Sequence, residues 1–313
     1  MSSMKAVRIH AYGGPDVLVY EDAPRPTAGD GEVLIRVHAT SVNPFDCAVR
    51  AGYMSGYFQY TLPLILGTDV SGVVEAIGPG VTNVSPGDAV YTRAGVFRDG
   101  ANAEYALAFA ADVVAKPSTL DHIHAAALPH VTLTAWQALI ESAQLSAGQT
   151  VLIHGAAGGV GHIAVQLAHW RGAKVIGTAS INLDLLRKLQ VEEAIDYTAT
   201  PFDSVVYGVD VVLDTIGGDV QQRSYATLKP GGMLVSTVQP PSEELAQTHG
   251  VRVSMVGTTP PVGPTLSTVA GLVASEQIKP VVSTILPLSE IRKAHEMIEG
   301  KHARGKIVLQ VAA

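Results

Sequence analysis

The stretch Thr150–Leu167, TVLIHGAAGGVGHIAVQL, decides the fold of this chain. Its apolar run Val151–Ile153 predicts a short buried parallel strand, and the small residues of His154–Gly159 predict a tight turn. From Val160 the apolar residues fall at helical intervals, and a second apolar run follows at Lys174–Thr178. The order strand, glycine turn, helix, strand is typical of a dinucleotide-binding unit.

The turn has Ala156, Gly158 and Gly161 at the spacing of a dinucleotide fingerprint whose first glycine is replaced by alanine. Small residues are required there because a pyrophosphate must approach backbone N–H groups at a helix N-terminus. We therefore predict a nucleotide site, and the alternative is a tight turn in an ordinary parallel sheet. The predicted nucleotide contacts in this turn are Ala156, Gly158, Gly159, Val160 and Gly161.

Length, composition and charge narrow the class of protein. A chain of 313 residues with 47% hydrophobic residues can form two domains. Cys47 is the one cysteine, so neither an internal disulfide nor a multi-cysteine zinc site can form. The net charge of −7 without a basic cluster argues against a nucleic-acid partner. We see neither an apolar run of membrane-spanning length nor a signal peptide, and we expect a cytoplasmic protein without membrane contact.

The order of predicted elements changes near Asp121. Before it, short strands with regular turn signals favour a compact, barrel-like β domain. After it, a long helix at Ala125–Ser142 leads into alternating strands and helices, the pattern of a doubly wound parallel sheet. From Ile278 a strand, a helix and a strand end the chain, and we expect them to return to the first domain.

Several further motifs give the chain a family resemblance. It resembles the medium-chain dehydrogenases/reductases, and specifically their zinc-free quinone oxidoreductase branch that includes zeta-crystallin. That resemblance implies a GroES-like β-barrel catalytic domain (1–122 and 277–313) and a Rossmann NADP(H)-binding domain (123–276), with the active site in the cleft between them. The motifs are Asn43-Pro44-Phe45-Asp46, Gly67-Thr68-Asp69-Val70-Ser71-Gly72-Val73-Val74, Leu133-Thr134-Ala135-Trp136-Gln137, the glycine turn, and Arg304-Gly305-Lys306-Ile307-Val308-Leu309.

The resemblance also bears on metal binding. Zinc-dependent relatives place a cysteine where this chain has Asn43 and a histidine where it has Thr68, and the third ligand position holds His130. One imidazole beside an amide and a hydroxyl is a poor ligand set for a catalytic zinc ion. We therefore predict an enzyme without a metal.

Polar residues must then orient the substrate, and the candidate catalytic residues are Asn43, Tyr53 and His130. Asn43 could bond a carbonyl oxygen that gains charge, or it could cap a helix. Tyr53, with Tyr57, could donate a proton or stack on a flat ring, or could pack at the rim. His130 could donate a proton near neutral pH, or it could be a core residue. The resemblance adds Asn43, Thr134 and Lys306 as cofactor contacts.

The identity of the cofactor depends on the end of the second strand. NAD-specific sites carry an acidic residue there that binds the ribose 2′-OH, whereas this strand ends in Thr178-Ala179-Ser180. Ser180 could donate to a 2′-phosphate, with positive charge from Lys174, and Tyr197 matches a family tyrosine beside the adenosine phosphate. Asp184 is close enough in sequence to oppose this preference. We predict NADPH rather than NADH.

Together these features predict an oxidoreductase that transfers a hydride from NADPH to a small electrophile, a quinone by preference. Reduction of the C=C bond of an enone, alkenal or enoyl thioester is the alternative reaction. A nucleotide-binding protein with vestigial activity is the alternative of a different class. We also expect a homodimer formed through Val251–Thr258.

Overall fold

The computed structural model describes residues 2–94, 98–257, 262–300 and 303–311. The chain divides into two compact units, the first made of 1–130, 261–276 and 280–313, the second of 131–260 and 277–279. Residues 123–130 and 262–276 thus lie in the first unit, whereas we had predicted both segments in the nucleotide-binding domain.

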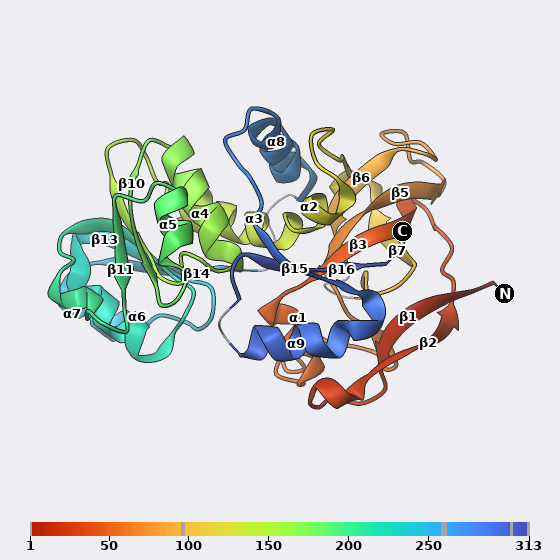
Figure 1. The fold of residues 1–313 in the computed structure, drawn as a ribbon, viewed down its shortest axis with the longest axis horizontal. Helices are drawn as coiled ribbons and strands as arrows, with labels where there is room; N and C mark the ends of the chain where they lie inside the picture. Colours follow the sequence, from red (N-terminus) through yellow and green to blue (C-terminus); the bar gives the residue numbers. More distant parts are fainter. Residues whose placement is uncertain (1, 95–97, 258–261, 301–302, 312–313) are drawn as a thin grey trace. The chain divides into compact units, whose positions relative to one another are not determined.

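The first unit is built on two sheets (Figure 1). A three-stranded sheet has the order β2-β1-β4, and a seven-stranded sheet has the order β15-β16-β3-β5-β6-β8, with β7 paired to β3. The strands are β1 (Ser3–Ile9), β2 (Leu18–Pro24), β3 (Glu32–Val42), β4 (Leu64–Ile65), β5 (Asp69–Ile77), β6 (Ala89–Arg93), β7 (Tyr105–Phe109), β8 (Val114–Ala115), β15 (Val282–Pro287) and β16 (Lys306–Gln310).

The end of the chain returns to the first unit as predicted, because β16 pairs antiparallel with β3 and places Ile307 opposite Val42. Helix α9 (Ile291–Glu299) buries Ile291 and Ala294 in the same apolar cluster as Ile307. The other helices of this unit are α1 (Pro44–Arg50), α2 (His122–Ala126) and α8 (Val262–Ala274), with the 3₁₀ turns η1 (Pro15–Val17), η2 (Ala110–Asp112) and η6 (Leu288–Glu290).

The single helix expected over Ala125–Ser142 is wrong. The chain forms α2, then α3 (Pro129–Trp136), then the π-helical segment η3 (Gln137–Ser142). Proline has no N–H to donate to the preceding turn and is tolerated at the start of a helix, so α3 begins at Pro129.

The second unit contains a six-stranded parallel sheet in the order β11-β10-β9-β12-β13-β14. Numbered along the chain this is 3-2-1-4-5-6, the doubly wound order. Because crossovers between parallel strands are right-handed, α4 and α5 lie on one side of the sheet and α6 and α7 on the other (Figure 1). The elements are β9 (Thr150–Ile153), α4 (Gly159–Trp170), β10 (Lys174–Ala179), α5 (Leu183–Lys188), β11 (Glu193–Asp196), η4 (Phe202–Ser204), β12 (Val209–Asp214), α6 (Gly218–Ser224), η5 (Tyr225–Thr227), β13 (Leu228–Ser236), α7 (Glu243–His249) and β14 (Arg252–Met255).

The predicted fold class, a GroES-like domain with a Rossmann sheet, is confirmed. The sequence reading had missed α7, which Ser242 caps by accepting from Leu245 N. None of the helices in the described ranges has the length and apolar character that crossing a membrane requires.

The glycine turn joins β9 to α4 with almost no space for side chains. Gly155 has φ +63°, a left-handed conformation that favours glycine, and Gly158 is the N-cap of α4. A Cβ on Gly161 would lie 2.2 Å from Gly155 O and 2.6 Å from Ala156 Cα, so the helix packs directly on the backbone of the turn. His162 reinforces this end of the helix, because its Nδ1 bonds Gly158 O at 2.9 Å.

We expect Gly161→Ala to lower the free energy of unfolding by about 1–3 kcal/mol and to weaken nucleotide binding, since the added methyl group forces α4 away from the turn. Gly271→Ala is the matched control, because Gly271 lies in α8 with nothing within 4 Å of the added Cβ. That variant should be neutral or up to about 1 kcal/mol more stable. Denaturant unfolding measures both; equal effects of the two substitutions would contradict the tight packing at Gly161.

Candidate active site

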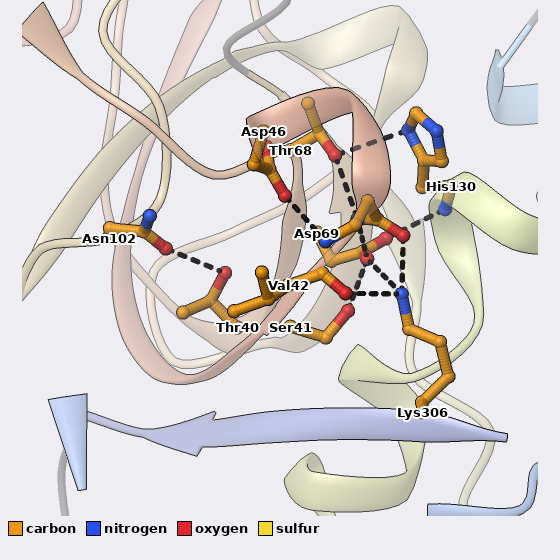
Figure 2. A network of polar contacts seen from close by, with 10 residues as sticks. Thr40, Ser41, Val42, Asp46, Thr68, Asp69, Asn102, His130 and Lys306 are labelled. Atoms are coloured by element: carbon orange, nitrogen blue, oxygen red, sulfur yellow. Dashed lines mark hydrogen bonds and ion pairs between the residues drawn. The ribbon is translucent and has the colours of Figure 1, made fainter. Parts of the chain in front are cut away.

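The first unit contains a buried polar cluster, which we call the Lys306 network (Figure 2). Its residues come from segments far apart in the sequence: the end of β3, the start of α1, the start of β5, the first turn of α3 and the first residue of β16. The members are Ser41, Asn43, Thr68, Asp69, His130 and Lys306.

Lys306 supplies the positive charge of the network. Its side chain is 3% exposed, and Nζ donates to Asn43 Oδ1 at 2.5 Å, Asp69 Oδ2 at 3.3 Å and Val42 O at 3.4 Å. An ammonium group has three hydrogens, so each of them has one of these three acceptors.

Asp69 is the matching negative charge and is fully buried. It accepts hydrogen bonds from Ser41 Oγ, from Asn43 Nδ2 at 2.8 Å and from the backbone N of His130 at 2.7 Å. Burial by itself raises the pKa of a carboxyl group, but the Lys306 ammonium and the hydrogen bonds outweigh it and hold the pKa of Asp69 below its usual value. Asp69 is therefore ionised, and it orders the side chains around it.

Asn43 occupies the N-cap position of α1, yet its side-chain amide belongs to the network. Its backbone N donates to Asp46 Oδ2 at 2.7 Å, so Asp46 supplies the side-chain half of the cap. The Asn43 amide bonds Lys306, Asp69 and, at 3.3 Å, Thr68 Oγ1. Asn43 thus stands at the helix N-cap, which was one of its two predicted roles. Both polar atoms of its side chain, Oδ1 and Nδ2, are bonded to other side chains of the protein.

His130 follows Pro129 in the first turn of α3. Its Nδ1 lies 3.2 Å from Thr68 Oγ1, and its ring packs on Phe45 with centroids 5.8 Å apart. Burial lowers the pKa of His130 to about 4, with Asp69 opposing that shift and Lys306 and Arg93 adding to it. A pKa this low disfavours the imidazolium at pH 7, which is the form that the expected proton donor requires.

The residues at the three zinc positions do not fit a metal ion. Asn43 Oδ1 already accepts from an ammonium, which would repel a divalent cation. Thr68 Oγ1 accepts from Asn43 Nδ2 and also bonds His130 Nδ1, so it is already engaged within the network. A catalytic zinc ion requires three protein ligands at these positions, but the oxygen atoms of Asn43 and Thr68 are already hydrogen-bonded to other residues.

Tyr53 and Tyr57 lie in the turn segment after α1, and their side chains point largely into solvent. They are 78% and 80% exposed, so they lie outside the buried network. Their aromatic faces are accessible to a flat molecule.

In the second unit, the predicted nucleotide residues gather at one edge of the sheet. The glycine turn follows β9, Ser180 follows β10 and Tyr197 follows β11, and carboxyl ends of parallel strands share an edge. Ser180 is half-buried and Tyr197 is 47% exposed. Lys174 begins β10 and therefore lies at the opposite edge, about 20 Å away by strand geometry.

Two further positions that enter the cofactor prediction have different surroundings. Thr134 is half-buried on α3. Asp184, which could oppose a 2′-phosphate, is exposed on α5 and lies 3.9 Å from the ammonium of Lys188.

Two buried residues that the sequence reading missed hold this edge in place. Asp214, at the end of β12, accepts from Ile216 N and Gly217 N through Oδ1, and from Gln221 Nε2 and Ser236 Oγ through Oδ2.

His154 opens the glycine turn and bonds Thr178 through Nδ1 and Ser224 through Nε2. A polar residue that ends an apolar strand was the available signal for both His154 and Asp214.

Comparisons with known proteins agree with the fold. Residues 29–118 match the family "Alcohol dehydrogenase GroES-like domain", and residues 189–309 match the family "Zinc-binding dehydrogenase". The chain thus has both parts of a medium-chain dehydrogenase/reductase.

Individual relatives show to which group of this superfamily the chain is similar. The chain is 33% identical to the quinone oxidoreductase of Homo sapiens, over 98% of this chain and 97% of that protein. The quinone oxidoreductase of Coxiella burnetii has a similar structure, with 36% identity and a TM-score of 0.91 over 99% of this chain and 100% of that one. A mycobacterial protein solved in complex with NADPH has 30% identity and a TM-score of 0.89, over 98% and 100%. The chain belongs to the quinone oxidoreductases of the medium-chain dehydrogenase/reductase superfamily.

The buried Asp46 carboxyl gives a testable pH effect on stability. Burial raises the pKa of Asp46 to about 7, and Asp69 adds to this shift, while the Asn43 hydrogen bonds and Lys306 oppose it. Because the folded pKa exceeds the unfolded one, the stability that a protonated Asp46 contributes is present at low pH and is lost as the pH rises through about 7. Asp46→Asn cannot ionise and keeps an acceptor for the Asn43 N–H.

We therefore expect Asp46→Asn to gain stability relative to wild type between pH 5 and 8, by about 3 kcal/mol at most. Thermal unfolding across this range measures the difference. Asp30→Asn makes the same chemical change at an exposed position and is the control. Parallel curves for wild type and Asp46→Asn would show that Asp46 does not titrate in this range.

Proposed function

We propose that this oxidoreductase transfers a hydride from NADPH to a quinone without a metal ion. The observation that carries the proposal is the Lys306 ammonium, which bonds Asn43 Oδ1 and Asp69 Oδ2 beside the positions where zinc-dependent relatives bind their metal. In this proposal the positive charge in the site is the Lys306 ammonium and no metal ion is bound. The reaction must therefore be one that needs no Lewis acid. Transfer of a hydride to a quinone meets that requirement, because the ring is a strong electron acceptor.

The residues around the glycine turn fit a dinucleotide. α4 has twelve residues, and its N-terminus follows directly on the turn. At Gly161 the Cβ of any larger residue would collide with the backbone of Gly155 and Ala156, so the helix lies directly against the turn. Gly158, Gly159 and Val160 would bind the pyrophosphate through backbone N–H groups, and Ser180 would donate to the 2′-phosphate. When bound, the dihydronicotinamide supplies the hydride.

For the acceptor, the chain supplies position and hydrogen bonds rather than acids and bases. Holding a flat ring in reach of the hydride donor provides most of the catalysis for so reactive an acceptor. The exposed rings of Tyr53 and Tyr57 are suited to stacking on it. In this proposal Lys306 holds the network together from within and does not contact the cofactor, because its hydrogens are already bonded.

Turnover of NADPH with a panel of quinones and enones tests the reaction. We expect quinones to be reduced, and activity to survive prolonged EDTA treatment with far less than one zinc per chain. Faster reduction of enones than of quinones would assign the chain to C=C reduction. Oxidation of neither NADPH nor NADH by any acceptor would leave a nucleotide-binding protein.

Cofactor preference is a separate prediction. We expect kcat/KM for NADPH to exceed that for NADH at least about tenfold, which corresponds to roughly 1.4 kcal/mol, because no carboxylate follows β10 to repel a 2′-phosphate. Ser180→Asp should erode or reverse this preference. Ser146→Asp adds the same charge before β9, at the other edge of the sheet, and should leave it unchanged. Wild-type protein that uses both cofactors equally would show that Ser180 does not bind the phosphate.

Assembly and location remain predictions. β14 is the edge strand of the parallel sheet, which is suited to pairing with a second copy of the chain, and Thr258 of the predicted contact lies outside the described residues. A monomeric mass in solution would contradict the homodimer. A cytoplasmic location is proposed on the sequence features alone.

A further inference from the structure

The loops that follow β12 and β13 are tied together by one carboxylate, that of Asp214. This residue is fully buried at the end of β12. Its Oδ1 accepts from the backbone N of Ile216 at 2.9 Å and of Gly217 at 2.8 Å. Its Oδ2 accepts from Gln221 Nε2 at 2.9 Å and from Ser236 Oγ at 3.0 Å. Four donors thus occupy the lone pairs of both oxygens, so the carboxylate serves to order the protein around it.

The loop after β12 lies against the glycine turn. Thr215 Oγ1 donates to His154 O at 2.8 Å. A Cβ on Gly155 would lie 2.6 Å from Thr215 Oγ1 and 3.2 Å from Ile216 Cδ1. Because Asp214 holds the backbone N–H of Ile216, it fixes the position of the Ile216 side chain beside this turn.

The loop after β13 is held through Ser236. The Ser236 hydroxyl donates to Asp214 and accepts from the backbone N of Val238 at 3.3 Å and of Gln239 at 3.4 Å. A Cβ on Gly217 would lie 3.0 Å from Val238 Cγ2, so the two loops are in close contact. Asp214 therefore orders both loops at once.

Ile216 and Val238 are branched aliphatic residues that these loops leave accessible at the carboxyl edge of the sheet. Their side chains are 53% and 48% exposed. Their backbone N–H groups are bonded inward, to Asp214 and to Ser236. The two side chains form an apolar surface that we call the Ile216–Val238 ledge, and such a surface is suited to the face of a flat ring.

The strand order indicates which part of a dinucleotide lies over this ledge. In a doubly wound sheet each half binds one mononucleotide outside the carboxyl ends of its strands. The half made of β9, β10 and β11 carries the glycine turn, Ser180 and Tyr197, to which the proposed function assigns the pyrophosphate and the adenosine side. The ledge follows β12 and β13 in the other half, which corresponds to the nicotinamide side.

We propose that Asp214 is a positioning residue for the nicotinamide half of the cofactor, because it fixes the Ile216–Val238 ledge on which the ring lies. This inference rests on the proposed function and deepens it, since it assigns residues to the half of NADPH that carries the hydride. A fixed ledge keeps the reacting carbon of the ring in one place, and positioning of this kind promotes hydride transfer without an acid or a base. Asp214 acts through Ile216 and Val238 and does not touch the cofactor.

Calorimetric titration of the full chain with two ligands tests this assignment. The ligands are NADPH and adenosine 2′,5′-bisphosphate, a fragment that lacks the nicotinamide half. In Asp214→Asn one carboxylate oxygen becomes an NH2 group, so at least one pair of donors loses its acceptor and the ledge is no longer fixed. We expect the dissociation constant of NADPH to rise about tenfold, while that of the fragment stays within about twofold.

Asp210→Asn is the matched control. Asp210 lies near the start of the same strand, where its Oδ2 accepts from Thr150 N at 2.9 Å. This variant should leave both dissociation constants unchanged. Equal weakening of NADPH binding by Asp210→Asn and Asp214→Asn would overturn the positioning role. Equal weakening of NADPH and of the fragment in Asp214→Asn would also overturn it, because the carboxylate would then support the whole sheet.

Ile216→Ser tests the ledge without disturbing the buried carboxylate, and it decides the question if Asp214→Asn does not fold. We expect the dissociation constant of NADPH to rise about fivefold or more, because apolar contact with the ring is lost, and that of the fragment to stay unchanged. Val205→Ser makes a similar change at a residue that precedes β12 and is 44% exposed, and it should change neither constant. Wild-type affinity of Ile216→Ser for NADPH would show that the ring does not lie on the ledge.

The outcomes separate this inference from the proposed function. If wild-type protein binds NADPH and reduces quinones, but Asp214→Asn and Ile216→Ser bind NADPH as tightly, the inference fails while the function stands. If wild-type protein prefers NADH, the same comparison is made with NADH and AMP. If wild-type protein binds neither dinucleotide, the proposed function fails and the inference fails with it.

Discussion

The buried ion pair between Lys306 and Asp69 is the constraint on which the candidate site depends. The two residues are 237 positions apart, and the pairing of β16 with β3 brings Lys306 beside Val42 and Asn43. Neither charge is stable there alone, because removing one partner of a buried pair leaves an uncompensated charge. The terminal strand of the chain therefore does more than complete the sheet, since it brings the cation around which the polar side chains are ordered.

This ion pair supplies a positive charge inside the candidate site from the protein itself. In zinc-dependent relatives the resemblance places the cation between the ligands, whereas here the ammonium bonds inward to an amide and a carboxylate. Lys306 donates to Asn43 Oδ1, and the Asn43 amide nitrogen donates in turn to Asp69 and Thr68.

Much of the fold was predictable from local sequence, while the site was predictable in part. The glycine turn specified the nucleotide-binding unit, because a tight turn before a helix leaves few residue types possible. The long helix was wrong because hydrophobic spacing continues across Pro129 although the backbone hydrogen bonds do not. The residues at Asn43, Thr68 and His130 were recognised, but the direction of their hydrogen bonds depends on Lys306, a contact between distant segments that no local pattern reveals.

The unfolding free energy of Lys306→Met tests the central claim most directly. Methionine has a similar length but no charge, so Asp69 would be left buried without its cation. We predict a loss of about 3–5 kcal/mol in denaturant unfolding, recovered in part when Asp69→Asn is added. A loss below about 1 kcal/mol for Lys306→Met would show that the site does not depend on this ion pair.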